Sequence, residues 1–96
     1  MRETEIEKYL KRGVEKRGGL CIKFVPICYA GFPDRLVFLP GGFFRMFELK
    51  SREGRLSYIQ KVVHLNLASR GFKVHLIFCT IDADNFFKEY DEWLGN

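Results

Sequence analysis

Residues 31–50 read GFPDRLVFLPGGFFRMFELK and predict a β-hairpin, the feature that decides the fold. Two apolar runs flank a Pro-Gly-Gly turn, where glycine supplies the positive φ that tight hairpins need. If Gly41 lies at the centre of the turn, opposed residue numbers sum to 82 and Asp34 lies opposite Glu48. A turn of Gly41-Gly42 alone shifts the sum to 83 and moves Asp34 opposite Leu49, on the other face unless a bulge intervenes.

Helices are predicted on either side of this hairpin. Residues 3–17 carry apolar side chains at four-residue spacing and end at Gly18-Gly19. A second helix begins at Ser57, which has capping-box spacing with Gln60, and it ends near Gly71. Its buried stripe is predicted to be Ile59, Val62, Val63 and Leu67. A last helix is capped by Asp82 or Asp84, and its inner side is predicted to be Phe86, Phe87, Tyr90, Trp93 and Leu94.

Two more strands complete the pattern. Residues 20–27 are rich in β-forming residues and end near Pro26, and residues 73–81 are apolar on both faces, which predicts a central strand. The order α-β-β-β-α-β-α therefore predicts a three-layer α/β fold, with a mixed four-stranded sheet between helices. A length of 96 residues fits a single domain, 1–96.

Composition excludes several classes of protein. No apolar run approaches the ~20 residues of a membrane helix, and the charged start MRETEIEKYLKRG is unlike a secretory signal. Three cysteines without a CxxC pair indicate reduced thiols and a cytoplasmic protein, and two histidines cannot build a multi-His metal cluster. The net charge of +4 is compatible with a polyanionic partner without demanding one.

The end of the hairpin carries the chemistry. Strand alternation places Glu48 and Lys50 on one face, together with Asp34 in the Gly41-centred register. Two opposed carboxylates repel each other, so a divalent cation between them is the natural partner. Oxygen ligands, including the Leu49 carbonyl, favour Mg²⁺ or Mn²⁺ over zinc. With Lys50 as a point charge, this set predicts metal-assisted hydrolysis of a phosphodiester.

These residues resemble a known family. The spacing of Gly31-Phe-Pro-Asp34 and Glu48-Leu-Lys50 is similar to the PD-(D/E)xK nuclease motif. The PGG turn, the stretch GRLSYIQ at 54–60 and the N-terminal REXEIEXYL pattern extend the likeness to the virus-type replication-repair nuclease (VRR-NUC) domain. The resemblance implies a restriction-endonuclease-like αβββαβ core, with helices on both sides of a mixed four-stranded sheet, plus a C-terminal helix.

It also implies function. Asp34 and Glu48 would be metal ligands, Lys50 the catalytic lysine, Gln60 a site residue, and an acidic residue of the first helix would lie nearby: Glu3 first, then Glu7, then Glu5. The implied activity is a Mg²⁺- or Mn²⁺-dependent DNA endonuclease, a homodimeric Holliday junction resolvase in the cytoplasm, acting on branched DNA. A monomeric flap or nicking nuclease and an inactive DNA-binding module stay open as alternatives.

Several of these residues have a second interpretation. Gln60 can cap its helix or face the site, and the two roles compete for one side chain. Glu3 can instead interact with the helix dipole, and His64, four residues after Gln60, can approach the site or be a partly buried surface residue. Phosphate contacts need only positive charge. The predicted nucleic-acid-binding residues are Lys23, Arg35, Arg52, Arg55 and Lys61.

Overall fold

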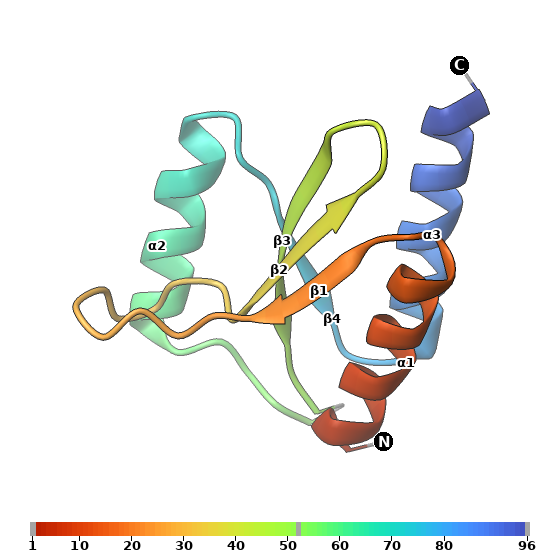
Figure 1. The fold of residues 1–96 in the computed structure, drawn as a ribbon. Helices are drawn as coiled ribbons and strands as arrows, with labels where there is room; N and C mark the ends of the chain where they lie inside the picture. The colour runs from red at the N-terminus through yellow and green to blue at the C-terminus, as the bar shows by residue number, and fades with distance from the viewer. Residues whose placement is uncertain (1, 52, 96) are drawn as a thin grey trace.

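The computed structural model describes residues 2–51 and 53–95 as a sheet between two layers of helices (Figure 1). The elements in chain order are α1 (Glu3–Lys16), β1 (Leu20–Lys23), β2 (Arg35–Leu39), β3 (Phe43–Leu49), α2 (Tyr58–Ser69), β4 (Val74–Ile77) and α3 (Thr80–Gly95). The strand order is β1-β2-β3-β4, antiparallel except for the parallel pair β3-β4. Helices α1 and α3 lie together on one face and α2 on the other, as Figure 1 shows, so the predicted fold class is confirmed.

The β2-β3 hairpin has the register centred on Gly41. Leu39 pairs with Phe43 and Leu36 with Met46, so opposed residue numbers sum to 82. Gly41 has φ 90° and Gly42 φ 79°, a conformation that other residues rarely adopt. The pairing that places Asp34 opposite Glu48 is therefore the one found, because it continues this ladder by one residue beyond Arg35–Phe47.

The hydrophobic core lies between the sheet and the α1/α3 layer. Strand alternation turns Phe43, Phe47 and Leu49 toward these helices. The helices contribute the fully buried stripe Ile6, Leu10 and Val14, together with Ala83, Phe86, Phe87 and Tyr90. The hydroxyl of Tyr90 donates to the Pro40 carbonyl at 2.9 Å, so α3 is also tied to the hairpin turn. This face supplies most of the apolar burial.

Several sequence predictions about the elements are wrong. Strand β4 is at the edge of the sheet rather than the centre, because β3 already pairs with β2 on its other side. It ends at Ile77 because α3 begins at Thr80, and Asp82 accepts the Phe78 N–H at 2.9 Å. Strand β1 ends at Lys23, and 24–34 form a loop. Of the predicted α2 stripe only Val63 is buried, and Trp93 and Leu94 on α3 are exposed.

Membrane insertion finds no support in the helices. Within 2–51 and 53–95, no helix is both long and apolar enough to cross a bilayer.

Candidate active site

Asp34 and Glu48 lie side by side on the α2 face of the sheet, where β2 and β3 come together. The Oδ1 atom of Asp34 accepts the Leu49 backbone N–H at 3.3 Å, so the carboxylate is held to the end of β3. Glu48 is only 2% exposed, although it is an acid. A buried carboxylate is costly unless it is paired, so its surroundings decide its role.

The environment of Glu48 raises the pKa of its carboxyl group above the ordinary value. Burial and, after it, the negative charge of Asp34 raise the pKa of Glu48 to about 7, although Lys50 opposes both. The Oε2 atom accepts a hydrogen bond from Gln60 Nε2 at 3.2 Å, and Lys50 Nζ lies 3.9 Å from it. The buried Oε1 atom has no hydrogen-bond partner among the described residues. Glu48 therefore accepts a hydrogen bond from the described residues on one of its two oxygens.

Gln60 performs both of the roles that the sequence pattern presents as competing. Its Oε1 accepts the Ser57 N–H at 2.9 Å while the Ser57 hydroxyl accepts the Gln60 N–H at 3.2 Å, which completes the capping box. Its Nε2 donates to Glu48 at the same time. This is possible because an amide has an acceptor at one end and donors at the other. The start of α2 is thereby fastened to the carboxylate.

His64 adds a site residue that the sequence only hinted at. Its Nε2 lies 3.5 Å from Glu48 Oε1, and both atoms are buried without a hydrogen-bond partner among the described residues. Burial lowers the pKa of His64, which favours the neutral imidazole. The available signal was its spacing from Gln60, since residues four apart share one helix face.

Arg35 does not have the free guanidinium that was predicted to contact phosphate. Its side chain lies on the α1 face, is 4% exposed, and bonds to the Glu7 carboxylate. A second guanidinium nitrogen donates to the Asp34 carbonyl at 3.0 Å and lies 3.3 Å from Asp34 Oδ2. Arg35 therefore connects α1 to Asp34, which corrects the prediction. The reason is strand alternation, which turns Arg35 toward α1 and away from the face that carries Glu48.

The three acidic residues of α1 that were predicted near the site differ in exposure and in partner. Glu7, the second choice, is the partner of Arg35, whereas Glu3, the first choice, is exposed. The negative charge of Glu3 nevertheless raises the pKa of Glu48, after the larger effects of burial and Asp34. Glu5 is exposed as well.

The other residues predicted to bind phosphate differ in the face of the molecule on which they lie. Lys23 is exposed and pairs with Arg35 in the sheet, so it lies on the opposite face from Glu48. Arg55, in the loop before α2, and Lys61, on α2, are exposed on the Glu48 side of the molecule. Arg52 lies outside the described residues. Arg55 and Lys61 are therefore the exposed members of the predicted set in the loop before α2 and on α2, and neither lines the pocket described next.

A pocket of about 280 Å³ opens over the carboxylate pair. It is lined by Asp34, Glu48, Lys50, Gln60 and the loop residues Phe24, Val25, Pro26, Tyr29, Ala30, Gly31 and Phe32. No group of three or more His, Cys, Asp or Glu side chains in the described ranges is placed to hold a metal ion. The predicted ligand set has two carboxylates and a carbonyl, so this absence does not test it.

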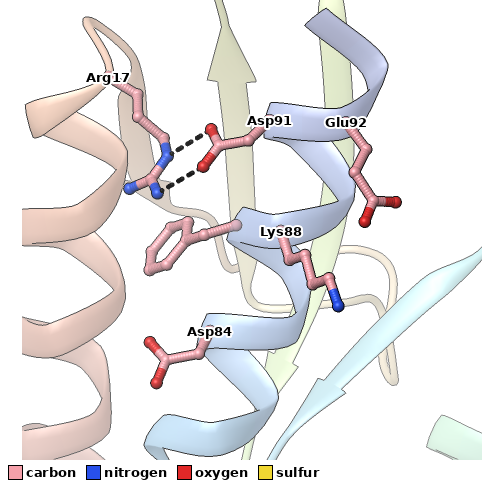
Figure 2. Close-up of a pocket in the computed structure, with 6 residues that line it drawn as sticks. Arg17, Asp84, Lys88, Asp91 and Glu92 are labelled. Atoms are coloured by element: carbon pink, nitrogen blue, oxygen red, sulfur yellow. Dashed lines mark hydrogen bonds and ion pairs between the residues drawn. The ribbon is translucent and has the colours of Figure 1, made fainter. Parts of the chain in front are cut away.

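Figure 2 shows a second hollow, of about 420 Å³, on the α1/α3 side. Arg17 bonds to both oxygens of Asp91 at 3.1 Å (Figure 2), and the Tyr9 hydroxyl donates to Asp84 at 2.6 Å. Arg17 also lies over the Phe87 ring. This hollow shares no lining residue with the Asp34–Glu48 pocket. The hydrogen bonds beside it join α1 to α3.

Comparison with known proteins finds similar chains in sequence and in structure. No family model matches the chain. A solved structure described as "VRR_NUC domain" superimposes with a TM-score of 0.83 and 29% identity, covering 92% of this chain and 96% of that one. A curated protein, "Putative nuclease p44" of Acyrthosiphon pisum secondary endosymbiont phage 1, is 39% identical over 74 residues, which are 77% of this chain and 80% of that protein. The chain therefore belongs to the VRR-NUC family of nucleases.

Proposed function

We propose that this chain is a Mg²⁺- or Mn²⁺-dependent, structure-specific DNA endonuclease that acts as a homodimeric Holliday junction resolvase. The observation that carries the nuclease chemistry is the convergence of Asp34, Glu48 and Lys50 in one pocket, with a buried Glu48 oxygen unpaired among the described residues. Burial and the Asp34 charge raise the pKa of Glu48, and a divalent cation bound between the two carboxylates would relieve this cost of ionising Glu48.

The residues present fit such an ion. Asp34, Glu48 and the Leu49 carbonyl would hold it, and their oxygen chemistry suits Mg²⁺ or Mn²⁺. When bound, the ion supplies Lewis acidity toward the scissile phosphate and toward water. Lys50, 3.9 Å from Glu48, places a positive charge where a phosphate gains negative charge. Gln60 orients Glu48, and Arg35 fastens Asp34 to α1.

An apolar surface between α2 and β4 supports the proposal of a homodimer. A groove of about 380 Å³ runs between α2 and the edge strand β4. Its lining is largely apolar, with Lys61, His64 and Lys73 as the polar members beside Leu56, Leu65, Ala68, Val74 and Leu76. An exposed sheet edge beside an apolar groove favours pairing with a second chain. Two copies related by a two-fold axis would offer two sites to a two-fold symmetric junction.

The test is a cleavage panel with the purified chain. Four-way junction, flap, nicked and linear duplex DNA are incubated with Mg²⁺, Mn²⁺ or EDTA. We expect metal-dependent cuts placed symmetrically in the junction, and a dimer by analytical ultracentrifugation at micromolar concentration. Asp34→Ala or Glu48→Ala should lower the cleavage rate more than about 100-fold while junction binding persists, because the removed carboxylates act on metal rather than on DNA.

The controls separate the alternatives. Glu53→Ala removes an exposed acid near the motif and should leave cleavage unchanged. A monomer that cuts flaps in preference to junctions would replace the resolvase with a flap nuclease. Binding without metal-dependent cleavage of any DNA would refute the enzyme and leave a DNA-binding module.

A further inference from the structure

Phe24 continues the row of residues that forms the active site. Lys23 pairs with Arg35, and one residue further the Phe24 N–H donates to the Asp34 carbonyl at 2.9 Å. Opposed residues of antiparallel strands share a face, and the β2–β3 register, continued by one residue beyond Arg35–Phe47, brings Asp34 opposite Glu48. Phe24, Asp34 and Glu48 therefore form a row across neighbouring strands, which lie about 5 Å apart.

An aromatic cluster builds on Phe24. Its ring meets Phe32 edge-to-face at 5.7 Å between centroids, and Tyr29 meets Phe32 at 5.9 Å. All three rings line the pocket that holds Asp34, Glu48 and Lys50. Phe24 and Tyr29 are exposed, and Ile27 at the loop tip is 99% exposed. Exposed apolar side chains gathered beside a pocket are typical of a site that binds an apolar group of a ligand.

The charge of this loop argues against a phosphate contact. Residues 24–33 read FVPICYAGFP and contain no charged side chain, whereas Lys50 is the cation among the described residues that line the pocket. Phosphate binding needs Lys, Arg or aimed backbone donors, and flat aromatic faces suit nucleobases. Since the scissile phosphate would sit at the carboxylates, the group next to the loop is the base attached beside it.

The loop is held in place before any ligand binds. Gly31 has φ 82°, and a Cβ on it would lie 2.8 Å from the Ile59 carbonyl oxygen of α2. This close approach seats the loop beside the start of α2, as Figure 1 shows for the backbone. Gln60, in the first turn of that helix, donates to Glu48. A preformed aromatic wall loses little conformational entropy when a base packs on it.

We propose that Phe24, Tyr29 and Phe32 form a nucleobase-binding wall for a base flanking the scissile phosphate, taken out of the DNA stack. The inference rests on the proposed nuclease function and deepens it. Bases at branch points and in single strands are already unstacked, so this wall favours them over continuous duplex. It thereby gives the chain a physical basis for choosing structured DNA without reading sequence.

Photocrosslinking of the unaltered protein gives the first test. Once the cut is mapped, 5-iododeoxyuridine is placed one nucleotide to each side of it in a flap or junction, and the complex is irradiated in EDTA. We expect crosslinks within residues 24–32. Crosslinks only to α2 or to the α1/α3 face would overturn the proposal.

Variants give the second test. Tyr29→Ala and Phe24→Leu should weaken binding to flap DNA roughly 5- to 100-fold, and binding to continuous duplex much less. Tyr58→Ala is the matched control, because Tyr58 is an exposed aromatic residue at the start of α2 that does not line the pocket. Equal losses on flap and duplex, or losses matched by Tyr58→Ala, contradict a base-binding wall.

The outcomes distinguish this inference from the proposed function. If the protein cuts DNA but neither crosslinking nor Tyr29→Ala implicates the loop, only the wall fails. If Tyr29→Ala converts a dimer to a monomer, the cluster is a contact between two copies and the wall also fails. If no DNA is cut with any metal, the proposed function itself fails, and the wall fails with it, because there is then no scissile phosphate for the bound base to flank.

Discussion

The two faces of the sheet differ in how they are packed and in what they can do. Toward α1 and α3, strand residues such as Val37, Phe47 and Leu49 are fully buried among apolar neighbours. Toward α2, the buried members are few: Met46, Val63 and the acid Glu48. The contrast teaches that this small domain concentrates its stability on one face and leaves the other loosely packed and polar enough for chemistry.

The largest expected effect compares truncations on the two faces. Phe47→Ala should lower the free energy of unfolding by about 3–5 kcal/mol, because it leaves a cavity among Phe86, His75 and their neighbours. Val63→Ala, on the α2 face, should cost only about 1–2 kcal/mol. Urea denaturation measures both, and equal losses would mean that the α2 face is as important to stability as the core.

The two faces should also respond to pH in opposite directions. On the α1/α3 face, burial lowers the pKa of His75 to about 4, where its ring stacks on Phe47. The unfolded chain takes up the proton first, so this stabilisation is complete above about pH 6.5 and is lost as the pH falls toward 4. Relative to His75→Gln, the wild type should lose about 2–3 kcal/mol over that range.

Glu48 gives the opposite sign. Its folded pKa of about 7 lies above the unfolded value, so its contribution is complete below about pH 4.5 and is lost as the pH rises through 7. In EDTA, Glu48→Gln should therefore gain stability relative to the wild type as the pH rises from 5 to 8. Denaturation series at fixed ionic strength measure both differences. Parallel curves for either variant and the wild type would mean that this residue does not link folding to protonation.

Two substitutions can separate the capping role of Gln60 from its hydrogen bond to Glu48. Gln60→Glu keeps an acceptor for the Ser57 N–H but replaces the donor to Glu48 with a negative charge, so cleavage should fall about 10- to 100-fold with the helix cap retained. Ser57→Ala should do the reverse and cost about 1 kcal/mol of stability with cleavage nearly unchanged. Cleavage rates and melting curves together decide; a matched loss of activity in both variants would assign Gln60 to capping alone.

The smallest effect concerns the cations on the α2 side. Arg55→Ala combined with Lys61→Ala should reduce the slope of log affinity against log salt by about one for each phosphate that the variant no longer binds. Lys23→Ala, on the opposite face, is the matched control and should leave the slope unchanged. If Lys23→Ala changes the slope and the double variant does not, the DNA binds on the α1/α3 face of the sheet instead.

Local pattern predicted the parts of this molecule whose partners are near in sequence. The turn glycines and the two-residue alternation of β2 and β3 limited the hairpin to two registers, and the structure has the one centred on Gly41, which brings Asp34 beside Glu48. The α1 stripe of Ile6, Leu10 and Val14 follows from helical spacing. The position of β4 did not follow, because an apolar strand can be central or at an edge covered by helices.

The site shows the same division. By itself, the sequence determined that Glu48 and Lys50 share a face of the strand, and it narrowed Asp34 to two hairpin registers, one of which brings it to the same face. Only the tertiary structure decided that Gln60 reaches Glu48 while it caps α2, that His64 lies beside the same carboxylate, and that Arg35 turns to Glu7. Those interactions depend on how each helix packs against the sheet, and packing is set by distant side chains rather than by local spacing.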